Sequence, residues 1–235
     1  MQSKTLEQLL ADRAAKRMVV LATDLDSGAE QLLYPFEDSA EDELTQAARA
    51  AARADKSGIA ELAGGSRRFL HVFNPPLRML IVGAVHIAQP LSRIALLAGY
   101  DVAIVDPREG FASADRFPGI TMIDEWPDDA MTAFDPDRRT AIVTLTHDPK
   151  LDDPALFQAL RSDAFYIGAL GSTRTHARRL ERLTAEGFGE PDFARIHGPI
   201  GLDIGAKSPA EIAVSIIAEV TQVLRRGPRR AELAA

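Results

Sequence analysis

Four short segments of the sequence carry polar or glycine residues directly after runs of apolar residues. They begin at Gly83, Asp106, Thr146 and Gly168. If the apolar runs are parallel strands, these segments meet at one edge of a sheet, where open α/β folds bind their ligands. The predicted cofactor-binding residues are therefore Gly83, His86, Asp106, Arg108, His147, Asp148, Gly171, Ser172 and Arg174. No residue is predicted to be catalytic or to bind a metal.

The first segment is placed like a dinucleotide-binding loop but lacks one of its glycines. Such a loop has the pattern G-x-G-x-x-G after the first strand, and the three corresponding residues here are Gly83, Val85 and Ala88. Gly83 permits the tight turn, and alanine is a tolerated third residue. Val85 places a side chain where a pyrophosphate would approach the backbone. The segment therefore predicts a strand, a turn and a helix, and it counts against NAD(P).

The second and third segments each allow a ligand contact or a local structural role. Asp106 lies about 20 residues after the glycine loop, where an acidic side chain often binds a ribose hydroxyl. It either contacts a nucleotide or caps its own loop, and Arg108 either binds an anion or is solvated. His86, which belongs to the first segment, likewise either caps the following helix or faces the ligand. His147 and Asp148 either orient a proton donor or an anion, or belong to an Asp-Pro turn.

The fourth segment has the features of an anion site at the start of a helix. Its glycines let the chain turn closely, and Ser172 is able to cap the following helix. The free amides of a helix N-terminus, the helix dipole and the Arg174 guanidinium all attract phosphate. Further along this helix, a solvated basic face is expected for Arg178, Arg179 and Arg182.

The sequence after residue 76 alternates between strand and helix patterns. Strands are expected at residues 78–82, 101–105, 120–123, 140–145 and 165–167, with helices at 87–98, 155–161 and 173–186. A last helix has its capping box at Ser208 and Glu211, with Pro209 at the first helical position. Alternating strands and helices predict a parallel sheet covered on both faces. Residues 77–235 are therefore predicted to form a Rossmann-like domain.

Residues 1–76 have a different pattern and predict a small α+β subdomain. Helices are expected at residues 5–16 and 41–54, and strands at 18–23, 31–36 and 68–73. Asn74-Pro75-Pro76 ends this part, because proline lacks an amide donor and disfavours helix in the residue before it. The predicted fold class of the whole chain is α/β, with the α+β subdomain preceding the parallel sheet.

The composition limits the kinds of partner and chemistry. The chain has 235 residues, enough for one main domain and a small one, and a net charge of −7. Net negative charge argues against nucleic acid as a partner. The absence of cysteine excludes disulfides, thiolate metal sites and a persulfide on the chain itself. No run of about 18 apolar residues is present, and no export signal is recognisable, so the expected location is the cytoplasm.

Five blocks of the sequence, taken together, resemble the C-terminal domain of the XdhC/CoxI family and follow its order. They are GAVHIAQPL, VDPREGFASADRFPG, LTHDPKLDDPAL, FYIGALGSTRTHARRLERL and RIHGPIGLDIGAKSPAEIAVSIIAE, within residues 77–225. The resemblance implies a protein that helps molybdenum hydroxylases, such as xanthine dehydrogenase and carbon monoxide dehydrogenase, to mature. It would bind a molybdopterin-type cofactor, alone or in its dinucleotide form, protect it during sulfuration and deliver it.

The chain also departs from the family pattern. Val85 replaces a glycine of the family's G-A-G-H loop, and residues 1–76 contain neither its G-S-S-P-R block nor its glycine-rich block with a cysteine. The resemblance therefore implies an apo-molybdoenzyme as a partner, with a sulfurtransferase or a separate protein that supplies the missing N-terminal domain. A homodimer is also considered.

Three interpretations of function remain open. The first, favoured by the resemblance, is a cofactor-binding chaperone without turnover. The second is an NAD(P)-dependent oxidoreductase, which Val85 disfavours. The third is a silent scaffold that keeps the fold and contacts only a partner protein. The small molecules that the purified protein releases would separate the three.

Overall fold

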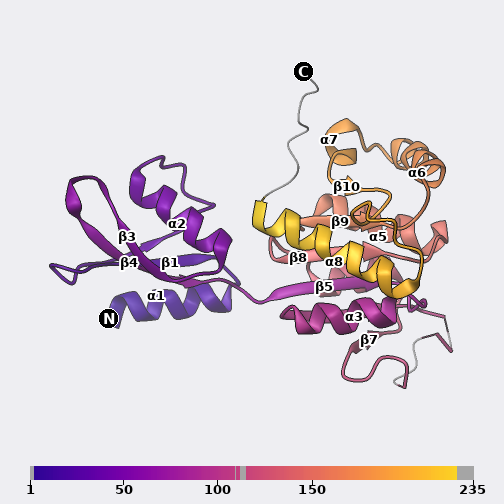
Figure 1. Cartoon of the computed structure of the whole chain (residues 1–235), viewed down its shortest axis with the longest axis horizontal. Coiled ribbons are helices and arrows are strands. Elements are labelled where there is room, and N and C mark those ends of the chain that lie inside the picture. The colour runs from indigo at the N-terminus through magenta and orange to yellow at the C-terminus, as the bar shows by residue number, and fades with distance from the viewer. Residues whose placement is uncertain (1–2, 109, 112–114, 227–235) are drawn as a thin grey trace. The chain divides into compact units, whose positions relative to one another are not determined.

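The computed structural model describes residues 3–108, 110–111 and 115–226. The chain divides into two compact units, Met1–Pro75 and Pro76–Ala235 (Figure 1). The division falls within the Asn74-Pro75-Pro76 segment at which the sequence predicted a boundary. Residues 227–235 of the predicted second domain lie outside the described residues.

The first unit is a four-stranded antiparallel sheet with two helices. Its strand order is β2-β1-β4-β3, with β1 Val19–Asp24, β2 Glu30–Leu33, β3 Gly58–Glu61 and β4 Arg67–Phe73. The helices are α1 Ser3–Ala14 and α2 Glu43–Ala54. Leu33 and Leu70 pack against Ala48 and Ala52 of α2. The sequence did not predict β3, because this short edge strand has no fully buried residue to reveal it.

The second unit contains a six-stranded sheet in which every pairing is parallel, in the order β10-β9-β8-β5-β6-β7. The strands are β5 Leu77–Val82, β6 Tyr100–Val105, β7 Thr121–Ile123, β8 Thr140–Thr144, β9 Tyr166–Ala169 and β10 Ile196–His197. The first strand of the unit lies in the middle, and later strands are added on either side, which is the doubly wound Rossmann order. The predicted α/β class with a Rossmann-like parallel sheet is confirmed.

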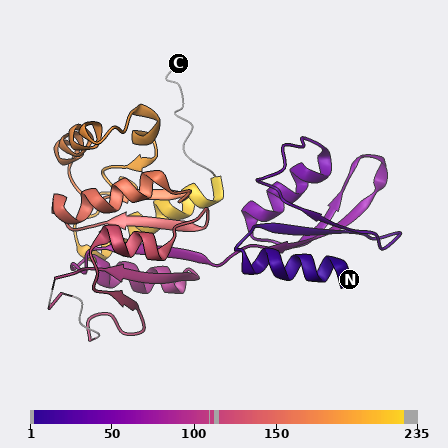
Figure 2. The same ribbon diagram turned by 180° about the vertical axis from the view of Figure 1, so that it is seen from behind.

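Helices cover both faces of this sheet. One face is covered by α3 Ala88–Leu97 and α8 Pro209–Arg226, and the other by α4 Pro127–Phe134, α5 Pro149–Arg161 and α6 Thr173–Ala185 (Figures 1 and 2). Alternate residues of β5 face the two layers: Met79 and Ile81 pack towards α3 and α8, and Leu80 and Val82 towards α4 and α5. A short helix, α7 Glu190–Phe193, precedes β10.

One predicted helix begins earlier than expected. The sequence placed the start of α5 at residue 155, whereas the helix begins at Pro149, six residues before it. Asp148 caps it by accepting a hydrogen bond from the Lys150 amide, and Pro149 takes the first helical position, where no amide donor is needed. Pro154 lies within the helix and obscured this start. In the described part of the chain, no helix is long and apolar enough to cross a membrane.

Candidate functional site

The loops after β5 and β8 touch at the point where the strand order reverses. The Gly83 amide donates to the Val105 carbonyl at 2.8 Å, and Gly83 has a φ of +108°. A Cβ at this position would lie 2.5 Å from Cγ2 of Thr146. Glycine is therefore needed at position 83 for both its backbone conformation and the close approach of the two loops. Ligands of doubly wound sheets bind beside this point.

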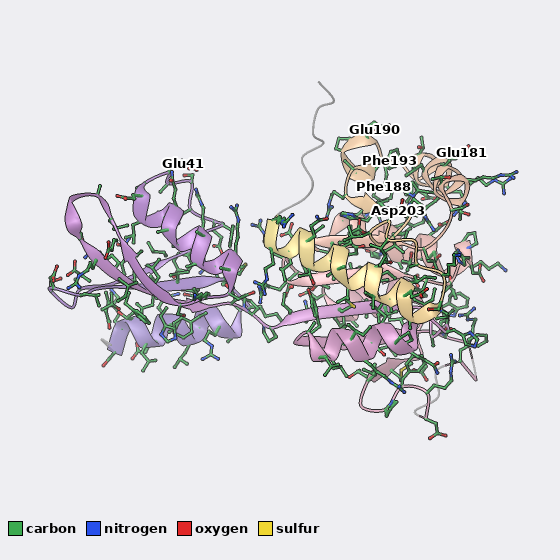
Figure 3. All side chains as sticks on the ribbon, viewed as in Figure 1. Glu41, Glu181, Phe188, Glu190, Phe193 and Asp203 are labelled. Carbon is green, nitrogen blue, oxygen red and sulfur yellow. The ribbon has the colours of Figure 1, made fainter. Side chains whose placement is uncertain are left out.

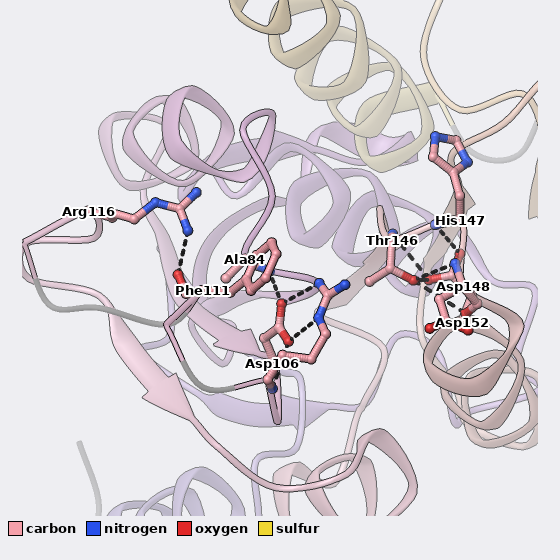
Figure 4. Close-up of polar contacts among 9 residues, drawn as sticks. Ala84, Asp106, Phe111, Arg116, Thr146, His147, Asp148 and Asp152 are labelled. Atoms are coloured by element: carbon pink, nitrogen blue, oxygen red, sulfur yellow. Dashed lines mark hydrogen bonds and ion pairs between the residues drawn. The ribbon is translucent and has the colours of Figure 1, made fainter.

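Asp106, at the end of β6, binds groups of its own chain. Its buried carboxylate accepts hydrogen bonds from the Ala84 amide at 2.8 Å and from Nε and Nη2 of Arg108 at 2.8 and 2.7 Å (Figure 4). Burial alone would raise the pKa of Asp106, but the hydrogen bonds from Arg108 and Ala84 outweigh it and the pKa is lowered. The ionised carboxylate therefore fastens the glycine loop to the end of β6.

Arg108 is held on two sides and is still partly exposed. Its guanidinium pairs with Asp106 and lies 4.3 Å from the ring centroid of Phe111. The carboxylates of Asp148 and Asp152 also raise the pKa of Arg108, after the larger effect of Asp106. Arg108 therefore lies within electrostatic reach of the loop that follows β8.

That loop is organised by Asp152, a residue that the sequence did not single out. The buried Asp152 carboxylate accepts hydrogen bonds from the Thr146 hydroxyl at 2.7 Å and from the amides of Thr146 and His147 at 3.3 and 3.1 Å (Figure 4). His147 has a φ of +62°, and its side chain is exposed. Burial raises the pKa of Asp152, although its hydrogen bonds and Arg179 oppose the shift.

A pocket of about 390 Å³ lies between this loop, the start of α5 and the side of α6. Its lining is strongly basic and consists of His147, Pro149, Asp152, Arg174, Thr175, Arg178, Arg179 and Arg182. The N-terminus of α6 adds to the wall. The Ser172 hydroxyl caps this helix by accepting a hydrogen bond from the Thr175 amide at 3.2 Å. A Cβ added to Gly171 would lie 3.0 Å from the Cβ of Thr175. Gly171 and Ser172 thus shape the wall that Thr175 forms.

The expectation of a solvated basic face is wrong for Arg179, which is buried, and for Arg182, which is held in an ion pair, whereas Arg178 is exposed as expected. Arg179 is 1% exposed and donates to the Leu170 carbonyl at 2.7 Å. Arg182 pairs with Asp153 of α5, with Nη2 and Oδ1 2.9 Å apart. Arg178 is exposed, but like the other two it lines the pocket. The sequence could not reveal this, because which side of α6 is buried depends on its packing against α5.

The structure brings most of the predicted residues into one continuous region. Gly83 touches Thr146, Asp106 joins the glycine loop to Arg108, and the Thr146 loop leads into the pocket that His147 and Arg174 line. Two predicted residues have other positions. His86 is exposed in the turn before α3 and does not line the pocket, and Asp148 caps α5.

His197 and Asp203 do not line this pocket. Nδ1 of His197 lies 3.1 Å from Oε1 of Glu219, and its ring stacks on Tyr166 with centroids 4.6 Å apart. Tyr166 and the Gly201 amide donate to the other Glu219 oxygen at 2.7 and 2.8 Å. His197 therefore belongs to a polar cluster at β9, β10 and α8. Asp203 is exposed in the loop between β10 and α8 (Figure 3).

No metal centre is formed by the residues that the structure describes. Within residues 3–108, 110–111 and 115–226, no group of three or more His, Asp or Glu side chains is placed to hold a metal ion. The donors of the region are instead backbone amides and guanidinium groups, which bind anions.

Comparisons with known proteins agree with this fold. Residues 79–220 match the family model of the XdhC Rossmann domain. A relative from Escherichia coli named molybdenum cofactor insertion chaperone PaoD is 32% identical over 64% of this chain and 41% of its own length. A relative from Bacillus subtilis, named as a probable component of xanthine dehydrogenase, is 31% identical over 67% of this chain and 46% of its own length.

A solved structure extends the likeness over both units. The crystal structure of a xanthine dehydrogenase from Bacillus halodurans superposes with a TM-score of 0.69 at 22% identity, over 95% of this chain and 67% of that one. At this identity the likeness shows the fold alone. The chain spans less than half the length of the two curated relatives. Because the family model covers more than half of the 235 residues, the chain belongs to the XdhC family.

Proposed function

We propose that this protein binds a molybdopterin-type molybdenum cofactor and assists its insertion into a molybdenum hydroxylase. The observation that carries the proposal is the match of residues 79–220 to the XdhC Rossmann domain, together with the likeness to a relative named as a molybdenum cofactor insertion chaperone. The chain needs no metal ligands for this role, because molybdenum arrives held by its pterin.

The residues at the carboxyl edge of the sheet fit such a ligand. Every molybdopterin carries a phosphate, and the arginine-lined pocket beside the α6 N-terminus offers the charge that a phosphate requires. Arg174 is an exposed guanidinium at the start of α6 and would bind the phosphate oxygens. His147 also lines the pocket and would hydrogen-bond to the same group or to the pterin.

The remaining predicted residues would position the cofactor and limit its access to water. Gly83 lets the loops after β5 and β8 approach closely, and the Asp106–Arg108 pair fixes the side of this region nearest β6. Asp148 and Ser172 hold the first turns of α5 and α6 in place. When bound, the cofactor supplies the molybdenum chemistry that the recipient enzyme uses, and the chain carries out no redox step itself.

Two features disfavour the alternative of an NAD(P)-dependent oxidoreductase. The side chain of Val85 is partly buried against the core, at the position where a second glycine would admit a pyrophosphate. The Asp106 carboxylate, the usual acceptor for a ribose hydroxyl, already accepts hydrogen bonds from Arg108 and Ala84. A nucleotide at this position would have to compete with both.

The partner proteins follow from the same proposal. An apo-molybdoenzyme would receive the cofactor. Because the chain has no cysteine, sulfur for the cofactor would come from a sulfurtransferase or another protein. A separate protein that carries the family's N-terminal domain is a third candidate, and self-association as a homodimer a fourth. The dinucleotide form of the cofactor is proposed alongside the simple form, because both carry phosphate.

The experiment that tests this function identifies what the protein holds after purification. The full chain is purified from cells that make the molybdenum cofactor, and the molecules released on denaturation are analysed by mass spectrometry. We expect a phosphorylated pterin together with molybdenum. NAD(P) in its place would favour the oxidoreductase, and no bound molecule, with or without added partner proteins, would favour the scaffold.

A further inference from the structure

A positively charged side chain is buried in the wall of the pocket without a negatively charged partner. Arg179 is 1% exposed, and its guanidinium donates to the Leu170 carbonyl at 2.7 Å and lies 3.4 Å from Nδ1 of His176. Its Nε is buried without any hydrogen-bond partner. In the described part of the chain no carboxylate forms an ion pair with Arg179, although Asp152 and Asp153 act on its charge from further away.

A buried and unpaired guanidinium is unusual for physical reasons. A charge loses its hydration on burial, and proteins normally compensate with an ion pair or with a complete set of hydrogen bonds. The neighbouring Arg182 follows this rule, because both of its donor groups nearest α5 bind the Asp153 carboxylate. Arg179 differs from Arg182 although both line the same cavity.

The charges around the cavity favour a doubly charged anion. Arg182 is neutralised by Asp153, so Arg174, Arg178 and Arg179 remain, opposed by Asp152. Three guanidinium groups against one carboxylate leave two net positive charges. The N-terminus of α6, capped by Ser172, lies at the same wall and adds its positive dipole end.

We propose that the pocket between α5 and α6 is a phosphate site, in which Arg178 and Arg179 bind a phosphate or pyrophosphate dianion together with Arg174. This inference rests on the proposed function, and it moves the anchoring point of the ligand away from the glycine loop. The Gly83 loop then borders the site without holding the phosphate, so Val85 in that loop would not obstruct a phosphorylated ligand.

The four arginines of the pocket have different roles. Arg179 is fixed by Leu170 and lies in the wall, so it offers a pre-oriented donor. Arg174 and Arg178 are exposed and would close over the anion from solvent. Arg182 and Asp153 tie α6 to α5 and would set the width of the pocket without contacting the ligand.

The test uses inorganic phosphate and inorganic pyrophosphate with the full-length protein, so it does not depend on the molybdenum cofactor. Affinities are measured by calorimetry, and the bound position by NMR signals of the arginine side chains. The variants are Arg178→Ala, Arg174→Ala and Arg179→Lys. The matched control is Arg93→Ala, because Arg93 is an exposed arginine on α3, which covers the opposite face of the sheet.

We expect saturable binding of at least one of the two anions. Each alanine variant should weaken it about tenfold, as expected for loss of a charge-assisted hydrogen bond. Arg179→Lys should also weaken binding, because a lysine keeps the charge but loses the forked donors. Arg93→Ala should match the wild type. Tighter binding of pyrophosphate would indicate the linkage of a dinucleotide, and tighter binding of phosphate a terminal phosphate.

Two results would overturn the phosphate site. One is the absence of saturable binding at millimolar anion, and the other is equal affinity for Arg178→Ala and Arg93→Ala. If a pterin cofactor is nevertheless released from the purified protein, the proposed function stands and only this site is wrong. If the anions bind as expected and no pterin is ever found, the site stands and the proposed function is wrong.

Discussion

Single residues at the edge of the sheet divide into those that hold the loops and those that are free to bind. Asp106 and Asp152 are both buried carboxylates, and each accepts hydrogen bonds from the amides of a loop that follows a strand. Gly83 allows the two loops to meet. The exposed Arg174 and the buried Arg179 line the pocket, and in the described part of the chain neither forms an ion pair with a carboxylate.

The sequence predicted part of this division. It identified Gly83, Asp106 and Arg174 from their positions after apolar runs, because a parallel sheet brings its strand ends together. It left the role of Asp106 open between ligand and loop, and the carboxylate fastens the loop. It could not identify Asp152 or Arg179. Both lie inside helices, and their burial follows from contacts between elements that are distant in sequence.

The contact between Gly83 and Thr146 predicts the effect of adding one methyl group. The Gly83→Ala substitution should destabilise the protein by about 2–4 kcal/mol, which combines the strain of a positive φ with overpacking against Thr146. The free energy of unfolding is measured by urea denaturation. The new Cβ would lie 2.5 Å from Thr146 Cγ2, so the Thr146 side chain or its loop must shift for it to fit.

Gly99 provides the matched control for this substitution. It also has a positive φ, of +86°, but a Cβ there would meet nothing within 4 Å. Gly99→Ala should therefore show only the cost of the backbone conformation, roughly 1–2 kcal/mol. Equal losses for the two variants would mean that the loops after β5 and β8 are not in close contact.

At the scale of elements, β9, β10 and α8 are joined by the carboxylate of Glu219. Tyr166 of β9, His197 of β10 and the Gly201 amide all bind it. Burial raises the pKa of Tyr166, and the neighbouring Glu219 adds to this, so the phenol keeps its proton and donates. The helix α8 and the loop before it are thereby fixed to the edge of the sheet.

The titration of Glu219 predicts how stability depends on pH. Burial would raise its pKa, but hydrogen bonds from His197 and Tyr166 outweigh this, so the pKa is lowered from 4.5. A lowered folded-state pKa means that Glu219 contributes its full stability above pH 4.5 and loses it as the pH falls through the folded-state value. The free energy of unfolding should therefore decrease on acidification.

The Glu219→Gln variant isolates this contribution. At neutral pH it should be less stable than the wild type by about 1–3 kcal/mol, because the amide cannot satisfy all three partners. Its stability should fall less steeply below pH 4.5. Parallel curves for variant and wild type over this range would show that Glu219 does not titrate as described.

The elements themselves were largely predictable from the sequence, for reasons that also explain the exceptions. Long amphipathic helices such as α8 carry their own caps and apolar stripe. The strands β5, β6 and β8 are nearly continuous apolar runs, as expected for strands buried on both faces. The two-residue strand β10 and the edge strand β3 have no such pattern. They are strands because their backbones pair with a neighbouring strand, and their own side chains do not indicate this.

At the scale of the whole molecule, the Rossmann unit carries the family match and the arginine-lined pocket. The first unit, Met1–Pro75, has its own core between α2 and an antiparallel sheet. The chain spans less than half the length of its two curated relatives. We therefore propose that cofactor binding belongs to the Rossmann unit, while delivery to a molybdoenzyme depends on partners that recognise the chain.

The proposed function requires that the Rossmann unit binds a phosphorylated pterin through its arginines. The most direct test is an anoxic calorimetric titration of the full-length protein with isolated molybdenum cofactor, for the wild type, Arg174→Ala and Arg93→Ala. We expect saturable binding that Arg174→Ala weakens about tenfold to a hundredfold, as for the loss of a charge-assisted hydrogen bond, and that Arg93→Ala leaves unchanged. Equal affinity of the wild type and Arg174→Ala, or no binding by the wild type even with partner proteins added, would contradict it.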